Sequence, residues 1–477
     1  MPTLRERLTE LGQDHVYAFT EGLTPVETTA FAADLESIDT EALPELVESY
    51  VLARPEFSMP GDVEPAEFFA LPGKPGGSWD RARHKAAGEE LIRAGKVGCF
   101  TVAGGQGSRL GYDGPKGCFP AGAVSDKPLF QIFAEGVLAA NRRYATNVPW
   151  YIMTSPLNHD ATVAFFREHS FFGLAEGSVM FFPQGTMTSF DREGKLLLSD
   201  KNRLATNPDG HGGAFAALWN SGAVADMKTR GVEHLSYFQV DNANVRVVDP
   251  VFLGLHAASD DSSGEMSSKM CRKAYAEEKV GMFCRSGGQT LVIEYSDMPA
   301  ELQAEKDENG QLRFLAGSIA IHVLSVAFIE KVATDPAFGL PWHRADKKIP
   351  HIDLKTGARV EPAEPNGVKL ERFIFDAVPL AEKSVVLETD RVEEFAPIKN
   401  ADVDGQAVKD SPASSKALQT ERSARWLEQR GVRVPRHEDG TPACTLEISP
   451  LTATEPDELP SDLVEGLKIE PGSSHAL

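Results

Sequence analysis

A glycine-rich loop with two cations is the segment of this sequence best suited to chemistry. The stretch AGGQGSRLGYDGPKG (103–117) carries Arg109 and Lys116 among its glycines. Glycines let a backbone turn tightly and bring its N–H groups close to a ligand. A guanidinium fork and a point-charge ammonium together suit a polyphosphate. A glycine-rich turn with two solvated cations is the alternative, and the apolar run that precedes the loop favours the phosphate site.

The two commonest nucleotide loops do not fit this segment. No GKS or GKT follows the glycines at the distance of a Walker A motif, and Leu110 occupies the third glycine position of a dinucleotide fingerprint after Gly105 and Gly107. The loop therefore indicates a phosphate site of another kind.

An aspartate at the end of an apolar run is the second candidate. The run HLSYFQV (234–240) is followed by Asp241. A carboxylate at the carboxyl end of a strand is well placed to hold Mg²⁺ between phosphates. An aspartate that bonds its own backbone in a turn is the alternative, and the residue alone does not decide between them.

Two further segments carry weaker signals. The glycine-rich stretch NPDGHGGAFAAL (207–218) opens a predicted helix, and its N–H groups could face a base or a ribose; His211 is either a ligand contact or a turn residue. Lys399 lies in EEFAPIKNAD (393–402), and a lone lysine is usually a solvated surface charge. No Ser-His-Asp, Cys-His or HExxH arrangement stands out.

The elements around these motifs predict an α/β fold. Residues 1–90 have the apolar spacing of helices, and from about residue 96 short apolar runs alternate with helical patterns. Strands that alternate with helices favour an open, mostly parallel sheet, whose ligands bind beyond the carboxyl ends of the strands. Predicted strands are 96–103, 148–155, 179–183, 234–240 and 290–296, and HDATVAFFREH, GAFAALWNSGAVADM and SIAIHVLSVAFIEKV are predicted helices. The expected domains are a helical region 1–90, a catalytic domain 91–385 and a small C-terminal domain 386–477.

Composition limits the partners and the compartment. The formal net charge is −22, with 42% hydrophobic and 25% charged residues. A protein that binds a phosphate backbone has the opposite charge, so we expect no nucleic acid partner. No apolar stretch reaches the roughly 18 residues of a spanning helix and the N-terminus lacks an apolar signal core, so we expect a cytoplasmic protein without a membrane partner. Five scattered cysteines favour neither disulfides nor a zinc site, and the absence of a coiled-coil seam favours a monomer.

Taken together, these motifs resemble a known family. The loop VAGGQGSRLGYDGPKG is similar to the signature of the UDP-sugar pyrophosphorylases, G-G-x-G-T-R-L-G followed by P-K-G. Over residues 90–420, the order of motifs resembles that of eukaryotic-type UDP-N-acetylhexosamine pyrophosphorylases: PWYIMTS, FFPQG, NPDGHGG, QVDNANV, VIEYSDM, KKIPHID, PNGVKLERFIFD and FAPIKNAD. The resemblance implies a Rossmann-like, GT-A-like fold. It also implies a Mg²⁺-dependent uridylyltransferase that joins UTP to a sugar 1-phosphate, with N-acetylglucosamine 1-phosphate expected first.

The resemblance also implies a role for individual residues. The phosphates of UTP would be held by Gly104, Gly105, Arg109 and Lys116. Mg²⁺ would be held by Asp241, and the uracil would meet Gln184, Gly210 and the adjacent His211. The sugar would be met by Gly281 and Glu294, between walls formed by Phe373 and Phe375, and its phosphate by Lys399. Such a reaction needs no general base, because a sugar phosphate is mostly dianionic at neutral pH, with a second pKa near ~6.

Three positions depart from the family pattern. Ser108 replaces a threonine, and His211 stands where the acetylhexosamine enzymes have asparagine and the UDP-glucose enzymes have a similar Gly-His-Gly. Ser318, in LAGSIAIH (315–322), replaces an asparagine that contacts the sugar. A UDP-glucose pyrophosphorylase or a broad-specificity UDP-sugar pyrophosphorylase is therefore the alternative. A non-catalytic nucleotide-sugar sensor is a remote one, which the joint presence of Arg109, Lys116, Asp241 and Lys399 disfavours.

Overall fold

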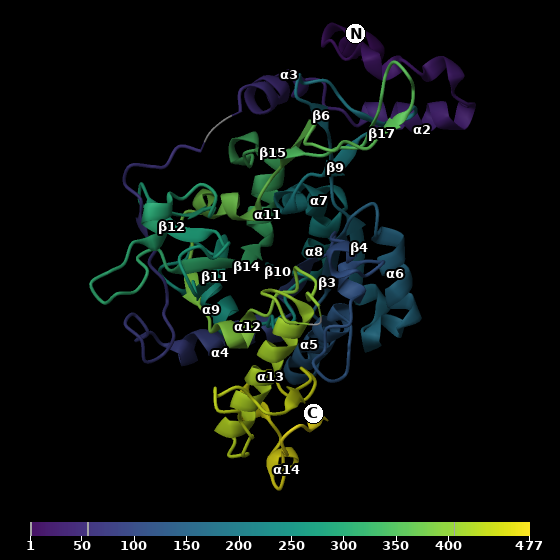
Figure 1. Cartoon of the computed structure of the whole chain (residues 1–477). Coiled ribbons are helices and arrows are strands. Elements are labelled where there is room, and N and C mark those ends of the chain that lie inside the picture. The colour runs from purple at the N-terminus through teal and green to yellow at the C-terminus, as the bar shows by residue number, and fades with distance from the viewer. Residues whose placement is uncertain (1, 55–56, 405) are drawn as a thin grey trace. The chain divides into compact units, whose positions relative to one another are not determined.

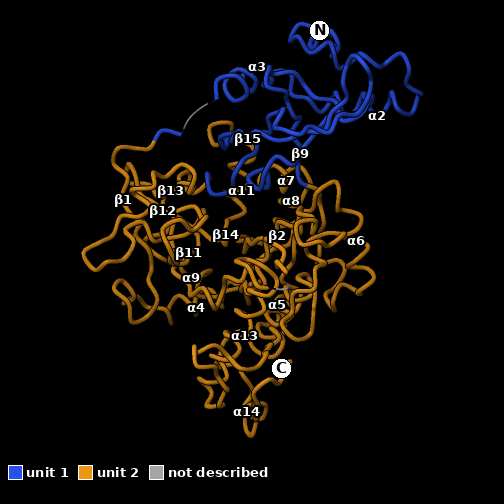
Figure 2. The backbone as a smooth tube through the Cα atoms, viewed as in Figure 1, with its two compact units in different colours: residues 1–58, 184–214, 339–376 blue, residues 59–183, 215–338, 377–477 orange. Residues whose placement is uncertain are grey.

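The structure is a computed structural model that describes residues 2–54, 57–404 and 406–477. The chain forms two compact units, which Figure 2 colours separately. Unit 1 comprises residues 1–58, 184–214 and 339–376, and unit 2 comprises residues 59–183, 215–338 and 377–477. Both units contain residues from more than one of the predicted domains 1–90, 91–385 and 386–477. That division into domains stays a prediction.

A large mixed sheet forms the centre of unit 2. Its main path runs β1-β12-β14-β10-β2-β3-β4, with β11 on β14, β13 on β12 and β19 on β11. The strands are β1 (Glu64–Pro65), β2 (Val97–Val102), β3 (Trp150–Thr154), β4 (Val179–Pro183), β10 (His234–Gln239), β11 (Met266–Arg272), β12 (Met282–Ser286), β13 (Gln289–Ile293), β14 (Ala316–Ser325) and β19 (Val386–Glu388).

The sheet has a parallel and an antiparallel part. Strands β10, β2, β3 and β4 run parallel to one another, so their carboxyl ends share one edge. Strand β14 is antiparallel to β10, β11 and β12. The predicted α/β class is thus confirmed, and the loops after β2 and β10 leave the sheet at the same edge.

Helices cover both faces of the parallel strands because those strands are apolar on both sides (Figure 1). On β3, Trp150 packs with Phe130 of α5 and Phe166 of α6, whereas its neighbour Tyr151 donates a hydrogen bond to Asp226 of α8. The helices of this part of unit 2 are α4 (Arg81–Arg93), α5 (Leu129–Tyr144), α6 (His159–Glu168), α7 (Ala214–Asn220), α8 (Ala223–Arg230), α9 (Pro250–Ala258), α10 (Ala300–Ala304), α11 (Val326–Thr334) and α12 (Arg391–Glu394).

Unit 1 brings together three segments that are distant in the sequence. Leu8 and Phe31 from the N-terminal helices share a buried cluster with Phe190 and Val368. Thr3 and Thr24 form capping boxes that start the first two helices. The elements are α1 (Leu4–Glu10), α2 (Pro25–Glu36), α3 (Leu43–Leu46), β5 (Thr186–Thr188), β6 (Phe190–Asp191), β7 (Leu198–Asp200), β8 (Arg203–Leu204), β9 (Thr206–Pro208), β15 (His343–Lys347), β16 (His351–Ile352), β17 (Arg359–Val360) and β18 (Gly367–Glu371).

The C-terminal part of unit 2 is organised by one long helix. Helix α13 (Pro412–Gln429) begins at a Ser411 cap and packs on strand β20 (Thr445–Glu447). Strand β20 pairs in parallel with β21 (Ser474–Ala476), and the short helix α14 (Ser461–Val464) lies between them in the sequence. Trp426 and Leu446 belong to the small core that these elements enclose.

One predicted helix is wrong. The segment SIAIHVLSVAFIEKV forms most of β14 followed by α11, with the change at Val326. The alternation of β-branched Ile319, Ile321 and Val323, all buried, is the strand signal that the helical interpretation passed over. A break at Gly222, which has a positive φ, also divides the predicted helix GAFAALWNSGAVADM into α7 and α8.

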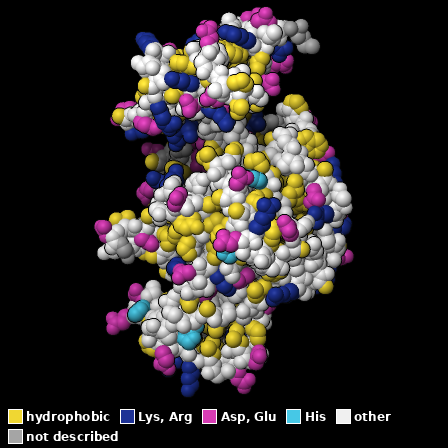
Figure 3. Space-filling view, turned by 90° about the vertical axis from the view of Figure 1, so that its right-hand side faces the viewer, with side chains coloured by type: hydrophobic (Ala, Val, Ile, Leu, Met, Phe, Trp, Pro, Cys, Tyr) yellow, Lys and Arg dark blue, Asp and Glu magenta, His cyan; other side chains and the backbone are white. Residues whose placement is uncertain are grey.

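The surface and the helices add two observations. Within the described residues, the structure has no helix with the length and apolarity needed to cross a bilayer. Figure 3 shows one face of the molecule, on which acidic and basic side chains are interspersed.

Candidate functional site

The glycine loop leaves β2 and folds back on itself. Gly107 N–H donates to the carbonyl of Gly114 (2.9 Å), and Lys116 N–H donates to the carbonyl of Gly105 (3.0 Å). A side chain at Gly105 would meet open space, whereas one at Gly117 would collide with the ring of Phe130. The loop therefore keeps an exposed backbone around Gly105 while its far end is anchored in the core.

Asn158 holds this loop and was not singled out from the sequence. Its amide donates to the carbonyls of Ala103 (3.0 Å) and Gly105 (3.3 Å), and its Oδ1 accepts the N–H of Ser155 (2.7 Å). The side chain is buried, at 1% exposure. An asparagine in a loop after a strand carries no charge signature, so only the fold reveals that the loop after β3 shapes the loop after β2.

Lys116 is the centre of a group of charges in unit 2. Its ammonium donates to the carbonyl of Ile398 (3.3 Å). Burial lowers the pKa of Lys116 below its ordinary value, the charge of Asp241 opposes that shift, and the cations Lys399 and Arg109 lower the pKa further. Four residues that are far apart in the sequence are thus close enough to act on one another electrostatically.

The loop that carries Asp241 is tied to the segment that carries Lys399. Ile398 N–H donates to the carbonyl of Asp241 (2.8 Å). Buried Asn242 donates through its amide to the carbonyl of Glu394 (2.7 Å) and accepts the N–H of Ala396 (2.9 Å). The two segments therefore form one backbone-paired platform beyond the carboxyl end of β10.

Lys399 itself is half-buried at the end of this platform. Its N–H donates to the carbonyl of Asp410 (2.6 Å), and its ammonium lies 5.9 Å from the ring centre of Phe395. The sequence alone gave Lys399 the weakest signal of the four charges. The pairing of residues 241–243 with 396–398 supplies the reason to include it.

Three of the five residues predicted to meet the sugar, Gly281, Glu294 and Ser318, lie in unit 2. Ser318 N–H donates to the carbonyl of Gly281 (2.8 Å), which joins the start of β12 to β14. A side chain at Gly281 would press against Glu294 Oε1, at 3.0 Å, so the carboxylate stands beside the glycine backbone. Ser318 is half-buried.

Phe373 and Phe375 belong to unit 1, the unit that also contains Gln184 and Gly210. The ring of Phe373 stacks on His211, with ring centres 5.3 Å apart, and on His343, at 4.3 Å. Phe375 lies 5.8 Å from His211. These rings build an aromatic wall beside the predicted base-binding loop.

The backbone of this loop is fixed by close packing. Gly210 has φ +87°, and a side chain there would collide with the carbonyl of Arg372. Gly212 N–H donates to that same carbonyl (2.8 Å), while Arg372 N–H donates to the carbonyl of Asp209 (2.8 Å). Only glycine meets both demands at position 210. Gln184 is buried and follows β4 directly in the sequence.

His211 is held as a neutral imidazole. Burial, with a smaller contribution from His343, lowers its pKa to about 4. Its Nδ1 accepts the N–H of Ile374 (2.9 Å), so the ring proton sits on Nε2. Nearby Asp209, whose carboxyl is enclosed by Gly185 and Gly213, has its pKa raised by burial to about 6.

A divalent cation at Asp241 would use one protein carboxylate. Within the described residues, the structure gives no group of three His, Cys, Asp or Glu side chains suited to a metal, and no hydrogen bond or ion pair to the Asp241 carboxylate. Mg²⁺ commonly binds through one or two carboxylates together with substrate phosphates and water. The donor set around Asp241 fits that pattern and does not fit an all-protein zinc or calcium cage.

Comparisons with known proteins point in one direction. Residues 80–437 match the family model described as UTP–glucose-1-phosphate uridylyltransferase. UDP-N-acetylhexosamine pyrophosphorylase-like protein 1 of Mus musculus is 36% identical, over 94% of this chain and 92% of that protein. UDP-N-acetylglucosamine pyrophosphorylase of Saccharomyces cerevisiae is 35% identical, over 91% of this chain and 92% of that protein. The Trypanosoma brucei UDP-N-acetylglucosamine pyrophosphorylase, solved with an inhibitor, aligns with a TM-score of 0.80 and 26% identity, over 98% of this chain and 96% of that one.

Proposed function

The chain belongs to the UTP–glucose-1-phosphate uridylyltransferase family, and we propose that it joins UTP to N-acetylglucosamine 1-phosphate, forming UDP-N-acetylglucosamine and pyrophosphate. The single observation that carries the proposal is the grouping of Arg109, Asp241 and Lys399 around Lys116 in unit 2. Three cations and one carboxylate at the carboxyl edge of a parallel sheet suit a nucleotide triphosphate with its metal.

The cations would act by alignment and charge neutralisation. The sugar phosphate arrives as a dianion and attacks the α-phosphorus of UTP in line with the leaving pyrophosphate. Arg109, Lys116 and the exposed N–H groups of the glycine loop would hold the triphosphate, while Lys399 would hold the attacking phosphate. Positive charge fixed around the transferring group stabilises the transition state more than the ground state.

Magnesium is the cofactor that we propose for this site, with Asp241 as its protein ligand. When bound, Mg²⁺ would neutralise phosphate charge. Asn242 keeps the backbone next to Asp241 paired with the segment that leads to Lys399.

The remaining residue roles follow the same proposal. Gln184, with an amide that both donates and accepts, would read the uracil edge, and Gly210 would pack against the base. His211, with its proton on Nε2, would offer a neutral donor. Gly281, Glu294 and Ser318 would meet the sugar, and the role of Phe373 and Phe375 as walls stays a prediction from the resemblance. We also propose that unit 2 has the Rossmann-like architecture of nucleotide-diphospho-sugar transferases, supported by its parallel strands β10-β2-β3-β4.

Glucose 1-phosphate is the alternative substrate, and one observation favours it. Ser318 bonds the backbone of Gly281, which lies against Glu294, and a serine there lacks the reach and the amide of asparagine. The names of the relatives that are 35–36% identical favour the N-acetylated sugar. A cytoplasmic location and a monomeric state stay predictions from the sequence.

The metal requirement tests the site directly. Pyrophosphate release from UTP and N-acetylglucosamine 1-phosphate should stop when EDTA removes Mg²⁺. The substitution Asp241→Asn should raise the Mg²⁺ concentration for half-maximal rate by about tenfold or more, because a coordinating anion is lost. Asp462→Asn, at an exposed site, is the matched control and should leave that concentration unchanged. A normal magnesium dependence in the Asp241 variant would contradict the assignment.

A further inference from the structure

A cavity lies in unit 2, bounded by α5, by the chain that follows Asn244 and by the C-terminal segment. Its volume is about 540 Å³, which is the size of a small-molecule site. Much of its wall is apolar. The apolar part includes Ile132, Ala139, Val245, Trp426, Ile448 and Leu451.

The polar part of the cavity wall is cationic although the chain as a whole carries −22. Four arginines line it, Arg142, Arg143, Arg246 and Arg422, against two glutamates, Glu455 and Glu458. Arg143 forms an ion pair with Glu458. Glu455 forms an ion pair with Lys85, which lies outside the cavity wall, at 2.5 Å. The side chains that line the cavity therefore carry more positive than negative charge, and Glu393, behind the wall, lies 3.6 Å from Arg246.

Two of these arginines are half-buried: nearby carboxylates raise the pKa of Arg246 against the effect of burial, whereas Arg422 has no hydrogen bond to a carboxylate within the described residues. Arg246 stands 3.6 Å from Glu393 and 3.7 Å from Glu455, beyond good hydrogen-bond distance. Arg422 donates only to carbonyl oxygens, those of Asn244 (3.1 Å) and Glu393 (3.4 Å), within the described residues. Burial lowers the pKa of Arg422 to about 10, and an anionic ligand would relieve that cost.

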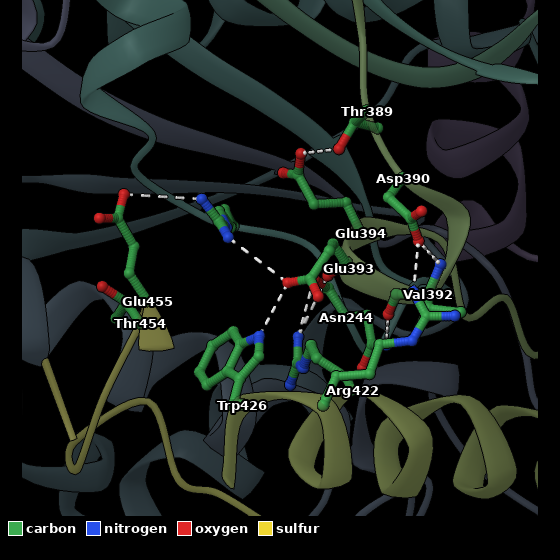
Figure 4. A network of polar contacts seen from close by, with 12 residues as sticks. Asn244, Thr389, Asp390, Val392, Glu393, Glu394, Arg422, Trp426, Thr454 and Glu455 are labelled. Atoms are coloured by element: carbon green, nitrogen blue, oxygen red, sulfur yellow. Dashed lines mark hydrogen bonds and ion pairs between the residues drawn. The ribbon is translucent and has the colours of Figure 1, made fainter. Parts of the chain in front are cut away.

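The same contacts connect the cavity to the proposed catalytic platform. Figure 4 shows Arg422 between Asn244 and Glu393, with Glu393 also accepting from the indole of Trp426 (2.9 Å). Asn244 donates in turn to the carbonyl of Val392 (2.8 Å). Arg422 thus bridges the loop that begins at Asp241 and the segment that leads to Lys399.

We propose that this cavity binds a small amphipathic organic anion, with a planar apolar body and one acidic group, and that the bound ligand changes turnover. The apolar wall would take the body and Arg142, Arg246 and Arg422 would face the acidic group. A ligand there touches Val245 and Arg422, so it acts on the positions of Asp241 and Lys399 without occupying the nucleotide loop. The binding part of the inference does not depend on the proposed function.

Anilinonaphthalenesulfonate is a suitable probe, because it joins an apolar aromatic body to one sulfonate. Direct excitation of the probe with the full-length protein should give a saturable fluorescence increase. Ala139→Trp fills the cavity and should weaken binding by about tenfold or more, which corresponds to ~1.4 kcal/mol. Arg142→Gln, at an exposed guanidinium that has no carboxylate partner within the described residues, should weaken it by about two- to fivefold.

Matched controls and a second readout complete the test. Ala164→Trp and Arg167→Gln change exposed positions of α6 and should leave the probe affinity unchanged. Saturating probe should change kcat or KM for UTP by about twofold or more in the wild type, and not in Ala139→Trp. Binding that survives both cavity variants, or that UTP displaces by simple competition, would overturn the assignment of the cavity. Binding lost in Ala139→Trp with unchanged turnover in the wild type would overturn the coupling to the platform.

Discussion

At the scale of single residues, Lys116 is the most informative position. Its ammonium lies at the junction of the glycine loop and the Lys399 segment and bonds the carbonyl of Ile398. Lys116→Ala should reduce kcat/KM by about 10²- to 10³-fold, because it removes charge that the transition state needs. Steady-state pyrophosphate release measures this effect. The control Lys468→Ala removes an exposed lysine and should keep full activity, and equal rates for the two variants would contradict the role of Lys116.

The burial of His211 should make the free energy of unfolding fall as the pH falls. Its folded pKa of about 4 lies below the ordinary 6.5. Between these two pH values the imidazole is protonated in the unfolded chain and neutral in the folded chain. Stability from this group is therefore complete above pH 6.5 and is lost as pH falls toward 4. Between pH 7 and pH 5, the loss should be about 2 kcal/mol.

Urea unfolding of His211→Asn measures that contribution. The free energy of unfolding of this variant should fall less between pH 7 and pH 5 than that of the wild type, by about 2 kcal/mol. His437→Asn, at an exposed position, is the control that should keep the wild-type slope. A variant with the same pH slope as the wild type would show that folding does not shift the pKa of His211.

Ser318 should tune the choice of sugar. Ser318→Asn restores an amide beside Gly281 and Glu294, and one added hydrogen bond is worth about 0.5–1.5 kcal/mol. The ratio of kcat/KM for N-acetylglucosamine 1-phosphate to that for glucose 1-phosphate should rise by about two- to tenfold. The control Ser286→Asn, at the end of β12, should leave this ratio of kcat/KM values unchanged. An unchanged ratio in Ser318→Asn would remove this residue from the account of specificity.

At the scale of elements, the pairing of two loops is the feature that organises the site. Asn242→Ala would leave the carbonyl of Glu394 and the N–H of Ala396 buried without their partner. Each unsatisfied group costs about 1–3 kcal/mol, so the free energy of unfolding should drop by at least about 2 kcal/mol. Asn309→Ala, in an exposed turn, serves as the comparison in denaturant unfolding. Stability equal to that of the wild type would mean that the pairing does not depend on Asn242.

Sequence patterns predicted the strands that carry the site better than the ties between them. The runs 96–103 and 234–240 correctly predicted β2 and β10, whose residues are mostly buried on both faces. Asn158 and Asn242 were missed because an uncharged side chain that bonds backbone carbonyls has no periodicity or charge to mark it. Strand β14 was taken for a helix because a buried apolar run fits both periods over a short stretch.

At the scale of the whole molecule, the division into units could not be obtained from the order of the chain. Unit 1 joins the N-terminal helices to residues 184–214 and 339–376. Its core places Leu8 with Phe190 and Val368, and contacts between segments so distant in sequence leave no local pattern. From the net charge of −22 we expect any phosphate site to gather cations locally, and Arg109 and Lys399 lie near enough to Lys116 to lower its pKa.

The central claim is that this chain is a uridylyltransferase for an N-acetylated sugar. The most direct measurement is pyrophosphate release by the purified protein with UTP and Mg²⁺, comparing the 1-phosphates of N-acetylglucosamine, N-acetylgalactosamine, glucose and galactose in parallel. We predict release with N-acetylglucosamine 1-phosphate, at a higher kcat/KM than with glucose 1-phosphate. Release with glucose 1-phosphate alone, or with none of the four, would contradict the claim.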